Sequence, residues 1–470
     1  MKIHKIIAAA IAICTAVTFG MPSDAGLRSN AIDLDNIDID VDASLENQYK
    51  FTLKNDGTYE ITEYIREPEE NPVFTPSPDI YLPKSYKGKP VTSIGARAFN
   101  TNNFDHITGT VNIPPSITSI GDYAFWMGEF SNCNIPETVT SIGIQAFDNT
   151  PYLENMRKKD PVVIINNILV DAKTASGDVV LPNTLTTIPG YAFYENESVE
   201  SVYIPDTVRS IGKYAFSGCS SLKKVNIPNS ITEISGWAFK HCEKLSGALT
   251  IPSSVKTIGD GAFWSCSGLS SINIENGVTY IGGSAFKFCM SVTDVSIPGS
   301  VKTIEGCAFS ENRQLKKIVI PASVGLIGQG CFRYCYSLDS VTIMNPECVI
   351  YDDDDTFPYY TDILGIEDST AHSYAKKYDR TFKSFDSLNL YGDVDGDKKI
   401  TANDASLVLT EYAALSAGKA AFTAEQTALA DVDGDGKITA NDASNILMFY
   451  AYLSGNGTET DIKIWLNNLS

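Results

Sequence analysis

The sequence predicts a solenoid with a parallel β-sheet and short helical or irregular convex turns, followed by a small all-α domain. The solenoid is indicated by a phrase of the form IG..AF, whose phenylalanine recurs every 23 or 24 residues from Phe193 to Phe332. The second domain is indicated by two nearly identical acidic segments, GDVDGDKKITANDASLVLTEYA from Gly392 and ADVDGDGKITANDASNILMFYA from Ala430.

The first 25 residues have the features of a secretory signal peptide. Lys2 and Lys5 precede an apolar stretch from Ile6 to Met21, and the segment Ser-Asp-Ala follows at 23–25. We expect cleavage after residue 25 and a secreted, soluble, extracellular protein. The alternative is an uncleaved membrane anchor, but the stretch is rich in Ala and Thr and shorter than the ~20 residues that span a bilayer.

The charge of the chain narrows the classes of partner. Its 57 acidic and 36 basic residues give a net charge of −21, which argues against nucleic acid and against anionic membrane surfaces. The sequence contains no second long apolar run, so we expect no membrane span. The length of 470 residues suits one long repeat array with a small additional domain.

Each repeated turn has the same order of apolar positions. A strand with the LxxLxL spacing of a leucine-rich repeat comes first and is ended by a proline. In the turn from Leu222 these positions are Leu222, Val225, Ile227 and Pro228, and the later inward positions are Ile231, Ile234, Ala238 and Phe239. The gap of 46 residues between Phe147 and Phe193 equals two periods, so we expect one degenerate turn there.

This pattern resembles the BspA-like leucine-rich repeat of bacterial secreted and surface proteins, over roughly residues 48–385. The resemblance implies first strands and an N-terminal cap in 26–90, a solenoid in 91–345 and a C-terminal cap in 346–385, with Ser369 at the start of a closing helix. Caps are needed because an open end exposes the core and an unpaired strand edge.

One column of the repeat, three residues after the phenylalanine, holds five cysteines: Cys219, Cys242, Cys266, Cys289 and Cys335. Asn196 and Asn312 occupy the same column in other turns. Because the column accepts Cys or Asn, we predict a small, mostly buried side chain that hydrogen-bonds the backbone at a turn. Disulfides between neighbouring turns stay open as an alternative, since stacked strands lie ~4.8 Å apart.

Both acidic segments have the ligand pattern of a calcium loop. Carboxylates stand at loop positions 1, 3, 5 and 12, with a backbone ligand at 7 and threonine at 9. The expected ligands are Asp393, Asp395, Asp397, the Lys399 carbonyl, Thr401 and Asp404, and then Asp431, Asp433, Asp435, the Lys437 carbonyl, Thr439 and Asp442. Crowded carboxylates repel without a cation, so we expect two Ca²⁺ ions whose binding is coupled to folding. A chance acidic turn is the alternative, which the duplication disfavours.

Each loop leads into one amphipathic helix, predicted at 405–415 and 443–453. Nothing before the first loop indicates an entering helix, so only the exiting helix of an EF-hand is expected. Two such loop-helix units, over 391–455, resemble the type I dockerin, which attaches secreted proteins to the cohesins of a cellulosome scaffold. The preceding residues 386–390 are interpreted as a linker. In the tail, 456–470, Trp465 and Leu466 either pack on the second helix or are free.

The resemblance implies a cohesin-binding face and hence a scaffold protein as partner. By the family's pattern the contact residues are Ala402, Asn403, Leu409, Thr410, Ala440, Asn441, Leu447 and Met448. The loop pairs Ala402-Asn403 and Ala440-Asn441 match each other but differ from the Ser-Thr pair common in the family, so the class of cohesin stays open. Thr410 and Met448 occupy equivalent positions and differ.

Two surfaces of the solenoid are candidates for ligand binding. The exposed strand positions are polar and nearly free of aromatic residues, which favours a protein ligand over a glycan. A second stripe places Tyr191, Tyr214 and Trp237 on consecutive turns. These rings either cover the outer wall of the core or form a binding stripe. The acidic run 352–355 is interpreted as a solvated loop, with a calcium site as the alternative.

The chain contains no HExxH, GxSxG, CxxC or phosphate-loop motif, and we expect it not to be an enzyme. Our hypothesis is a secreted, non-catalytic binding protein that acts as an accessory subunit in polysaccharide breakdown, docked to a cellulosome-type scaffold. One alternative is an enzyme of plant polysaccharide degradation, or an inhibitor of such an enzyme, since paired catalytic carboxylates need no local motif. Another alternative is a cell-surface adhesin.

Overall fold

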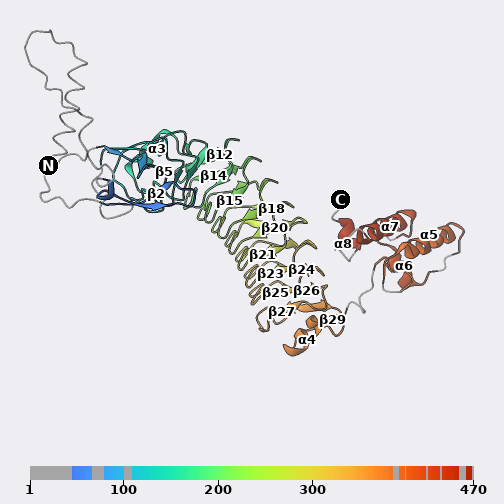
Figure 1. Ribbon diagram of the computed structural model, residues 1–470. Coiled ribbons are helices and arrows are strands. Elements are labelled where there is room, and N and C mark those ends of the chain that lie inside the picture. Colours follow the sequence, from blue (N-terminus) through green and yellow to red (C-terminus); the bar gives the residue numbers. More distant parts are fainter. Residues whose placement is uncertain are drawn as a thin grey trace, which may run out of the picture. The chain divides into compact units, whose positions relative to one another are not determined.

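The computed structural model describes residues 45–65, 79–99, 108–384, 391–396, 399–419, 422–433, 437–454 and 462–467 (Figure 1). It begins with an antiparallel hairpin of β1 (Tyr49–Leu53) and β2 (Tyr59–Tyr64), and Gly57 has a left-handed φ of 81° in the turn. β2 then pairs in parallel with β5 (Lys89–Ile94), which also pairs with β4 (Ser85–Tyr86). The hairpin therefore covers the strand edge at which the repeated array begins.

A parallel ladder forms at the isoleucine of the repeated phrase, where each turn contributes two extended residues. The first part continues from β5 through β7 (Ser119–Ile120) and β9 (Ser141–Ile142). An eight-stranded part follows, made of β13 (Thr187–Ile188), β15 (Ser210–Ile211), β17 (Glu233–Ile234), β19 (Thr257–Ile258), β21 (Tyr280–Ile281), β23 (Thr303–Ile304), β25 (Leu326–Ile327) and β27 (Val349–Ile350). Short convex turns were expected, but this second sheet was not.

The other sheet follows the leucine-like positions and is divided into groups of parallel strands. The groups are β3 (Ile80–Tyr81), β6 (Thr110–Asn112) and β8 (Asn132–Asn134); β12 (Gly177–Val180), β14 (Val199–Tyr203) and β16 (Lys224–Val225); β18 (Gly247–Ile251), β20 (Leu269–Ile274) and β22 (Asp294–Ser296); and β24 (Lys317–Ile320), β26 (Ser340–Ile343), β28 (Asp362–Gly365) and β29 (Phe382–Ser384). The predicted solenoid of parallel strands is confirmed.

The repeat phenylalanines are fully buried between the two sheets and form two runs of rings, Phe99 to Phe147 and Phe193 to Phe332. Neighbouring rings are stacked, with centroids 4.7 Å apart for Phe193 and Phe216 and 5.6 Å apart for Phe309 and Phe332. This spacing follows from the distance between adjacent strands, because each turn places its ring on the ring before it. Phe357 continues the second run by one turn beyond the last repeat found in the sequence.

The degenerate turn between Phe147 and Phe193 keeps the backbone path while losing the ring. Ala172 takes the place of the phenylalanine, and its N–H donates to the Ala192 carbonyl at 2.7 Å, as Phe193 donates to Ala215 in the next turn. An unexpected helix, α3 (Pro151–Lys159), and a hairpin of β10 (Val163–Ile165) and β11 (Ile168–Asp171) fill the extra length. These elements interrupt the isoleucine ladder between β9 and β13.

A short helix packs against the last turns of the array. Helix α4 (Thr370–Lys377) has Ser369 as its N-cap, and the Ser369 hydroxyl accepts from the backbone N–H of His372 at 3.2 Å. Tyr374 of this helix is buried, and its ring meets Phe357 edge-on at 5.5 Å. The predicted start of a closing helix at Ser369 is confirmed, and β29 (Phe382–Ser384) follows the helix.

The C-terminal segment is helical, as predicted, with two helices more than expected, α6 (Ala424–Ala430) and α8 (Ile462–Asn467). Helices α5 (Ala402–Ser416) and α7 (Ala440–Ser454) begin three residues earlier than predicted and pack against each other. The expectation that exiting helices alone accompany the loops is wrong for the second loop. Helix α6 (Ala424–Ala430) ends directly before it, and a capping box of Thr423 and Gln426 starts this helix.

The tail contributes to the core of this helical region. Helix α8 (Ile462–Asn467) buries Ile462 completely, and the Trp465 ring lies 5.3 Å from the Phe449 ring of α7. Of the two possibilities left open by the sequence, packing on the second helix is the one that the structure shows.

Candidate metal centres and binding surfaces

Each acidic loop brings three of its predicted ligands together. One carboxylate oxygen from each of Asp393, Asp395 and Asp404 lies within 4.8 Å of the others, and the second loop repeats this with Asp431, Asp433 and Asp442. Oxygens bound to Ca²⁺ at 2.3–2.6 Å are separated by at most about 5 Å. The clusters therefore fit calcium. The predicted ligands at position 5, Asp397 and Asp435, lie outside the described residues.

The aspartate at position 12 closes each loop onto its helix. Asp404 is fully buried and accepts from the N–H groups of Val394 at 2.9 Å and Asp395 at 3.3 Å with one oxygen. The other oxygen accepts from the N–H and the hydroxyl of Thr401, at 2.8 and 3.1 Å. Asp442 makes the equivalent bonds in the second loop. The short side chain, a predicted metal ligand, thus also occupies position N3 of a helix capping box.

The remaining loop positions are consistent with the predicted roles. Asp393 is 5% exposed and accepts from the N–H of Gly396 at 2.9 Å, and Gly396 has a left-handed φ of 73°. The side chains of Lys399 and Lys437 are exposed, in keeping with ligation through their carbonyl groups. Burial, with a contribution from the nearby Asp433 carboxylate, raises the pKa of Asp442.

The two loops are held by equivalent apolar residues. Val394 and Ile400 of the first loop correspond to Val432 and Ile438 of the second, and all four are buried in one core with residues of α5 and α7. Because the loops share a core, each depends on the other for its position. The two loops, which are duplicated in the sequence, therefore also pack in the same way.

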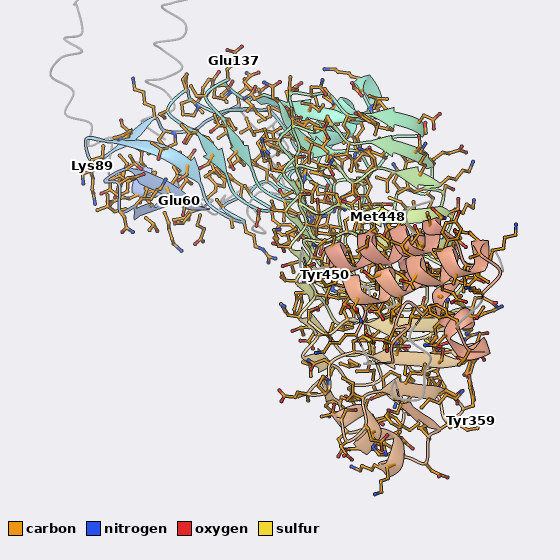
Figure 2. All side chains as sticks on the ribbon, turned by 90° about the vertical axis from the view of Figure 1, so that its right-hand side faces the viewer. Glu60, Lys89, Glu137, Tyr359, Met448 and Tyr450 are labelled. Atoms are coloured by element: carbon orange, nitrogen blue, oxygen red, sulfur yellow. The ribbon has the colours of Figure 1, made fainter. Side chains whose placement is uncertain are left out.

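The predicted cohesin contacts form an exposed surface of α5 and α7. All eight residues are exposed: Ala402, Asn403, Leu409, Thr410, Ala440, Asn441, Leu447 and Met448. Three further large apolar residues, which the sequence reasoning did not single out, are also exposed on these helices: Tyr412 at 42%, Leu415 at 42% and Tyr450 at 39%. Met448 and Tyr450 both project from α7 (Figure 2). Large exposed apolar side chains in such numbers are typical of an interaction surface.

Asn403 and Asn441 connect this surface to the metal loops. The amide of Asn403 donates to a carboxylate oxygen of Asp395 at 2.6 Å, and Asn441 donates to Asp433 at 2.8 Å. Each amide therefore orients a carboxylate that is predicted to bind metal, while remaining exposed. This second role was not predicted from the sequence.

The cysteine column of the solenoid has the predicted character. The thiols of Cys219, Cys242, Cys266, Cys289 and Cys335 are buried, and each donates to the carbonyl of a phenylalanine in the preceding turn at 3.1–3.4 Å. All nine cysteines of the described chain are free thiols. Burial raises the pKa of Cys219 and Cys335 to about 12.

The aromatic stripe is half-buried and stacked along the array. The ring of Tyr214 lies 5.1 Å from Tyr191 and 6.4 Å from Trp237. All three residues have left-handed φ values, of 63°, 58° and 62°. The glycines at 261 and 330 in the same column were a sign of this conformation that the sequence reasoning missed. The rings cover the core wall and still keep part of their surface exposed.

The acidic run 352–355 is occupied by contacts within the solenoid end. Asp352 pairs with Lys377 of α4, Asp355 pairs with Arg333, and Asp353 accepts from Gln329 at 3.1 Å. These contacts are those of a surface loop. One carboxylate oxygen from each of Asp353, Asp354 and Asp355 also lies within 4.8 Å of the others, so the calcium alternative stays open.

Comparisons with known proteins agree with this architecture. The profile of the BspA type leucine rich repeat region matches six copies over residues 79–185, 186–312 and 246–359, and that of the dockerin type I domain matches 391–448. Both kinds of domain are non-catalytic. No curated protein matches the chain, and no helix in the described part is long and apolar enough to cross a membrane.

Solved structures of leucine-rich repeat proteins are also similar to this chain. A leucine rich cell surface protein of Faecalibacterium prausnitzii is 24% identical, with 64% of this chain and 88% of that chain covered and a TM-score of 0.35. A leucine-rich repeat protein of Bacteroides ovatus is 23% identical, with 72% and 98% covered and a TM-score of 0.32. The chain belongs to the BspA type leucine-rich repeat family and carries a C-terminal type I dockerin domain.

Proposed function

We propose that this protein is a secreted, non-catalytic binding subunit of a cellulosome-type assembly. The dockerin holds two Ca²⁺ ions and binds a cohesin of the scaffold, and the solenoid binds a further partner, with a protein favoured on its strand face. A dockerin domain implies attachment through a cohesin, and leucine-rich repeats suggest a binding role.

The observation that carries this proposal is the matched pair of carboxylate clusters beside an exposed apolar face. In each half the position-12 aspartate joins the loop to the first turn of a helix, and the same helix presents Leu409 or Leu447 to solvent, 43% and 41% exposed. Calcium neutralises the carboxylates that would otherwise repel, and it thereby holds both helices in one arrangement. Docking should therefore require calcium.

The strand face supports a protein ligand. Its side chains are mainly polar and charged, including an exposed ion pair of Lys223 with Glu200 at 2.8 Å. Tyr203 is 53% exposed, and its strand partner Val180 is 74% exposed, so a small apolar centre lies among polar neighbours. This combination of an apolar centre and a polar rim is typical of protein interfaces.

A pull-down with candidate cohesins tests the docking proposal. We expect the full chain to bind in calcium and to lose binding in chelator. The double variant Leu409→Asp with Leu447→Asp should lose binding in calcium, whereas Val180→Asp, a matched apolar change on the solenoid, should retain it. Each single variant shows how much of the binding depends on one half of the domain. Binding by the double variant, or undiminished binding in chelator, would overturn the proposal.

An assay of the same chain on plant polysaccharides and on peptides tests the non-catalytic role. We expect no release of sugars or peptides above the level of a buffer control. Turnover that is lost on substituting one exposed Asp or Glu would overturn this part of the proposal and would favour the enzyme alternative.

A further inference from the structure

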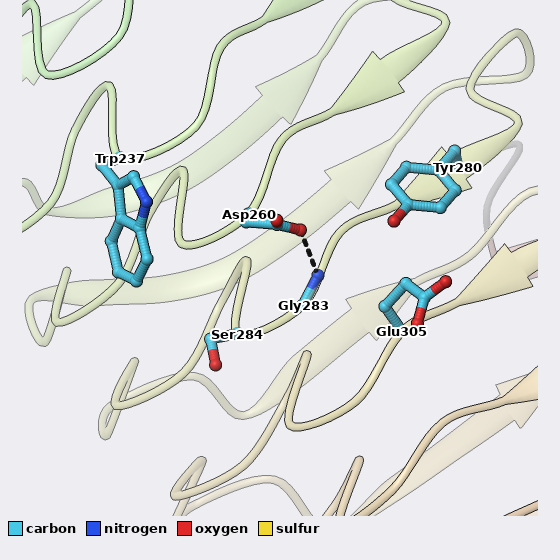
Figure 3. Close-up of a pocket in the computed structure, with 6 residues that line it drawn as sticks. All are labelled: Trp237, Asp260, Tyr280, Gly283, Ser284 and Glu305. Atoms are coloured by element: carbon cyan, nitrogen blue, oxygen red, sulfur yellow. Dashed lines mark hydrogen bonds between the residues drawn. The ribbon is translucent and has the colours of Figure 1, made fainter.

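A shallow hollow of about 470 Å³ lies on the solenoid beside Trp237, the last ring in the column of Tyr191, Tyr214 and Trp237 (Figure 3). Further rings continue from Trp237 through Trp264 to Phe288, which belong to other columns of the repeat. Tyr191, Tyr214 and Trp237 stand two residues before the phenylalanines of three consecutive turns, and the next two turns carry Gly261 and Ser284 at this position. Of these two small residues, Ser284 lines the hollow, whereas the space at Gly261 is filled by the Trp237 ring. The lining residues of the hollow are Trp237, Asp260, Tyr280, Gly283, Ser284 and Glu305.

Gly261 makes room for the Trp237 ring. It has a left-handed φ of 59°, and a Cβ atom added there would lie 2.2 Å from Cε3 of Trp237. The indole therefore occupies the space above the backbone of this turn, where any other residue would displace it. On its other side the ring is stacked on Tyr214 with an angle of 8° between the planes. Trp237 is thus held in place as the aromatic wall of the hollow.

The other lining groups are hydrogen-bonding groups. Asp260 accepts from the N–H of Gly283 at 2.8 Å, which fixes its carboxylate beside the hollow (Figure 3). Glu305, the hydroxyl of Tyr280 and the hydroxyl of Ser284 complete the lining. A rigid ring next to several acceptors and hydroxyls suits a ligand that has an apolar C–H face and many hydroxyl groups.

The charges disfavour an anionic ligand in the hollow and a cation at the Trp237 ring. Two carboxylates line the hollow, and the chain has a net charge of −21, so an anionic ligand is disfavoured. A cationic ligand would meet the ammonium group of Lys240, which already lies 5.4 Å from the centre of the Trp237 ring and 4.8 Å from that of Trp264. A neutral ligand avoids both repulsions.

We propose that this hollow binds sugar residues of a neutral polysaccharide, with one sugar against Trp237 and its hydroxyls donating to Asp260 and Glu305. The site is distinct from the strand face for which a protein ligand is proposed. It gives the solenoid a contact with the polysaccharide in addition to the docking of the C-terminal domain.

Titration calorimetry of the full chain with cellohexaose, xylohexaose and mannohexaose tests the site. We expect at least one of the three to bind, with equal affinity in 0.05 M and 0.5 M NaCl. Trp237→Ala should weaken binding about tenfold or more, and Glu305→Gln and Asp260→Asn several-fold each. Tyr81→Ala removes a 72% exposed ring elsewhere on the array and should leave the affinity unchanged.

Further controls separate loss of the site from loss of folding. Trp237→Phe keeps an aromatic ring and should bind more tightly than Trp237→Ala, with unchanged circular dichroism. Sugar binding should persist in chelator, and cohesin binding should persist in Trp237→Ala, so failure here is distinct from failure of the docking proposal. Absence of binding to all three probes overturns the inference. Affinity that is unchanged in Trp237→Ala, or that is lost at high salt together with binding of a lysine-rich peptide, also overturns it.

Discussion

Replacing Asn196 by alanine should destabilise the solenoid far more than the same change at a cysteine of the same column. Asn196 is 2% exposed and makes four hydrogen bonds with its side chain. Its amide donates to the carbonyls of Ala172 and Ala175, both at 2.8 Å, and its oxygen accepts from the N–H groups of Ser198 and Val199, both at 2.9 Å. In the alanine variant, each of these four backbone groups loses its hydrogen bond to the Asn196 side chain.

The size of the effect follows from this count of bonds. A hydrogen bond contributes about 1 kcal/mol net, so loss of four lowers the free energy of unfolding by about 4 kcal/mol. Cys242 makes one bond with its side chain, to the carbonyl of Phe216 at 3.2 Å, and Cys242→Ala should cost about 1 kcal/mol. Asn196→Cys should lie between the two, since a thiol restores one donor.

Urea unfolding of the three variants, with hydrogen exchange of residues 196–199, measures the difference. We expect the amides of Ser198 and Val199 to exchange faster in Asn196→Ala, because both lose their acceptor. Equal stabilities of Asn196→Ala and Cys242→Ala, or unchanged exchange of the two amides, would refute the reasoning.

Three other changes have defined outcomes. Asp404→Ala or Asp442→Ala should reduce bound calcium from two ions to one, measured by equilibrium dialysis, and two retained ions would contradict the ligand assignment. Arg157→Met removes the guanidinium that donates to the buried Asp171 carboxylate at 2.7 and 2.8 Å. Because it leaves a buried carboxylate without this partner, the variant should lower the free energy of unfolding by about 3–5 kcal/mol in urea titrations. A loss below about 1 kcal/mol would be inconsistent with this pairing. Burial raises the pKa of Cys219 from 9.0 to about 12. The thiol should therefore react with a disulfide reagent at pH 8 only after unfolding. Between pH 9 and 12 the unfolded state loses the thiol proton while the folded state keeps it. The stabilisation from the protonated thiol is therefore complete below pH 9, and the free energy of unfolding decreases by up to about 1.4 kcal/mol per pH unit between pH 9 and 12. A thermal midpoint that stays constant over this range would argue against the raised pKa.

The solenoid was predictable because its core residues recur at a fixed spacing in the sequence. One phenylalanine per turn, with isoleucine and alanine at fixed distances from it, places the same residues inside in every turn. The degenerate turn shows the limit of this signal. Its backbone follows the common path through Ala172, but helix α3 and the β10–β11 hairpin fill its length, and these elements have no counterpart in other turns from which they could be inferred.

The order of the residues along the chain was sufficient to identify the repeat and the duplicated acidic loops of the dockerin, because these features depend on spacing within one turn or one loop. The second parallel ladder, the roles of Asn403 and Asn441 beside the metal ligands, and the hollow beside Trp237 depend on groups in different turns or segments that packing brings together. Such contacts are set by the stacking of turns and by the left-handed backbone at residues such as Tyr214 and Trp237, and sequence spacing alone does not encode them.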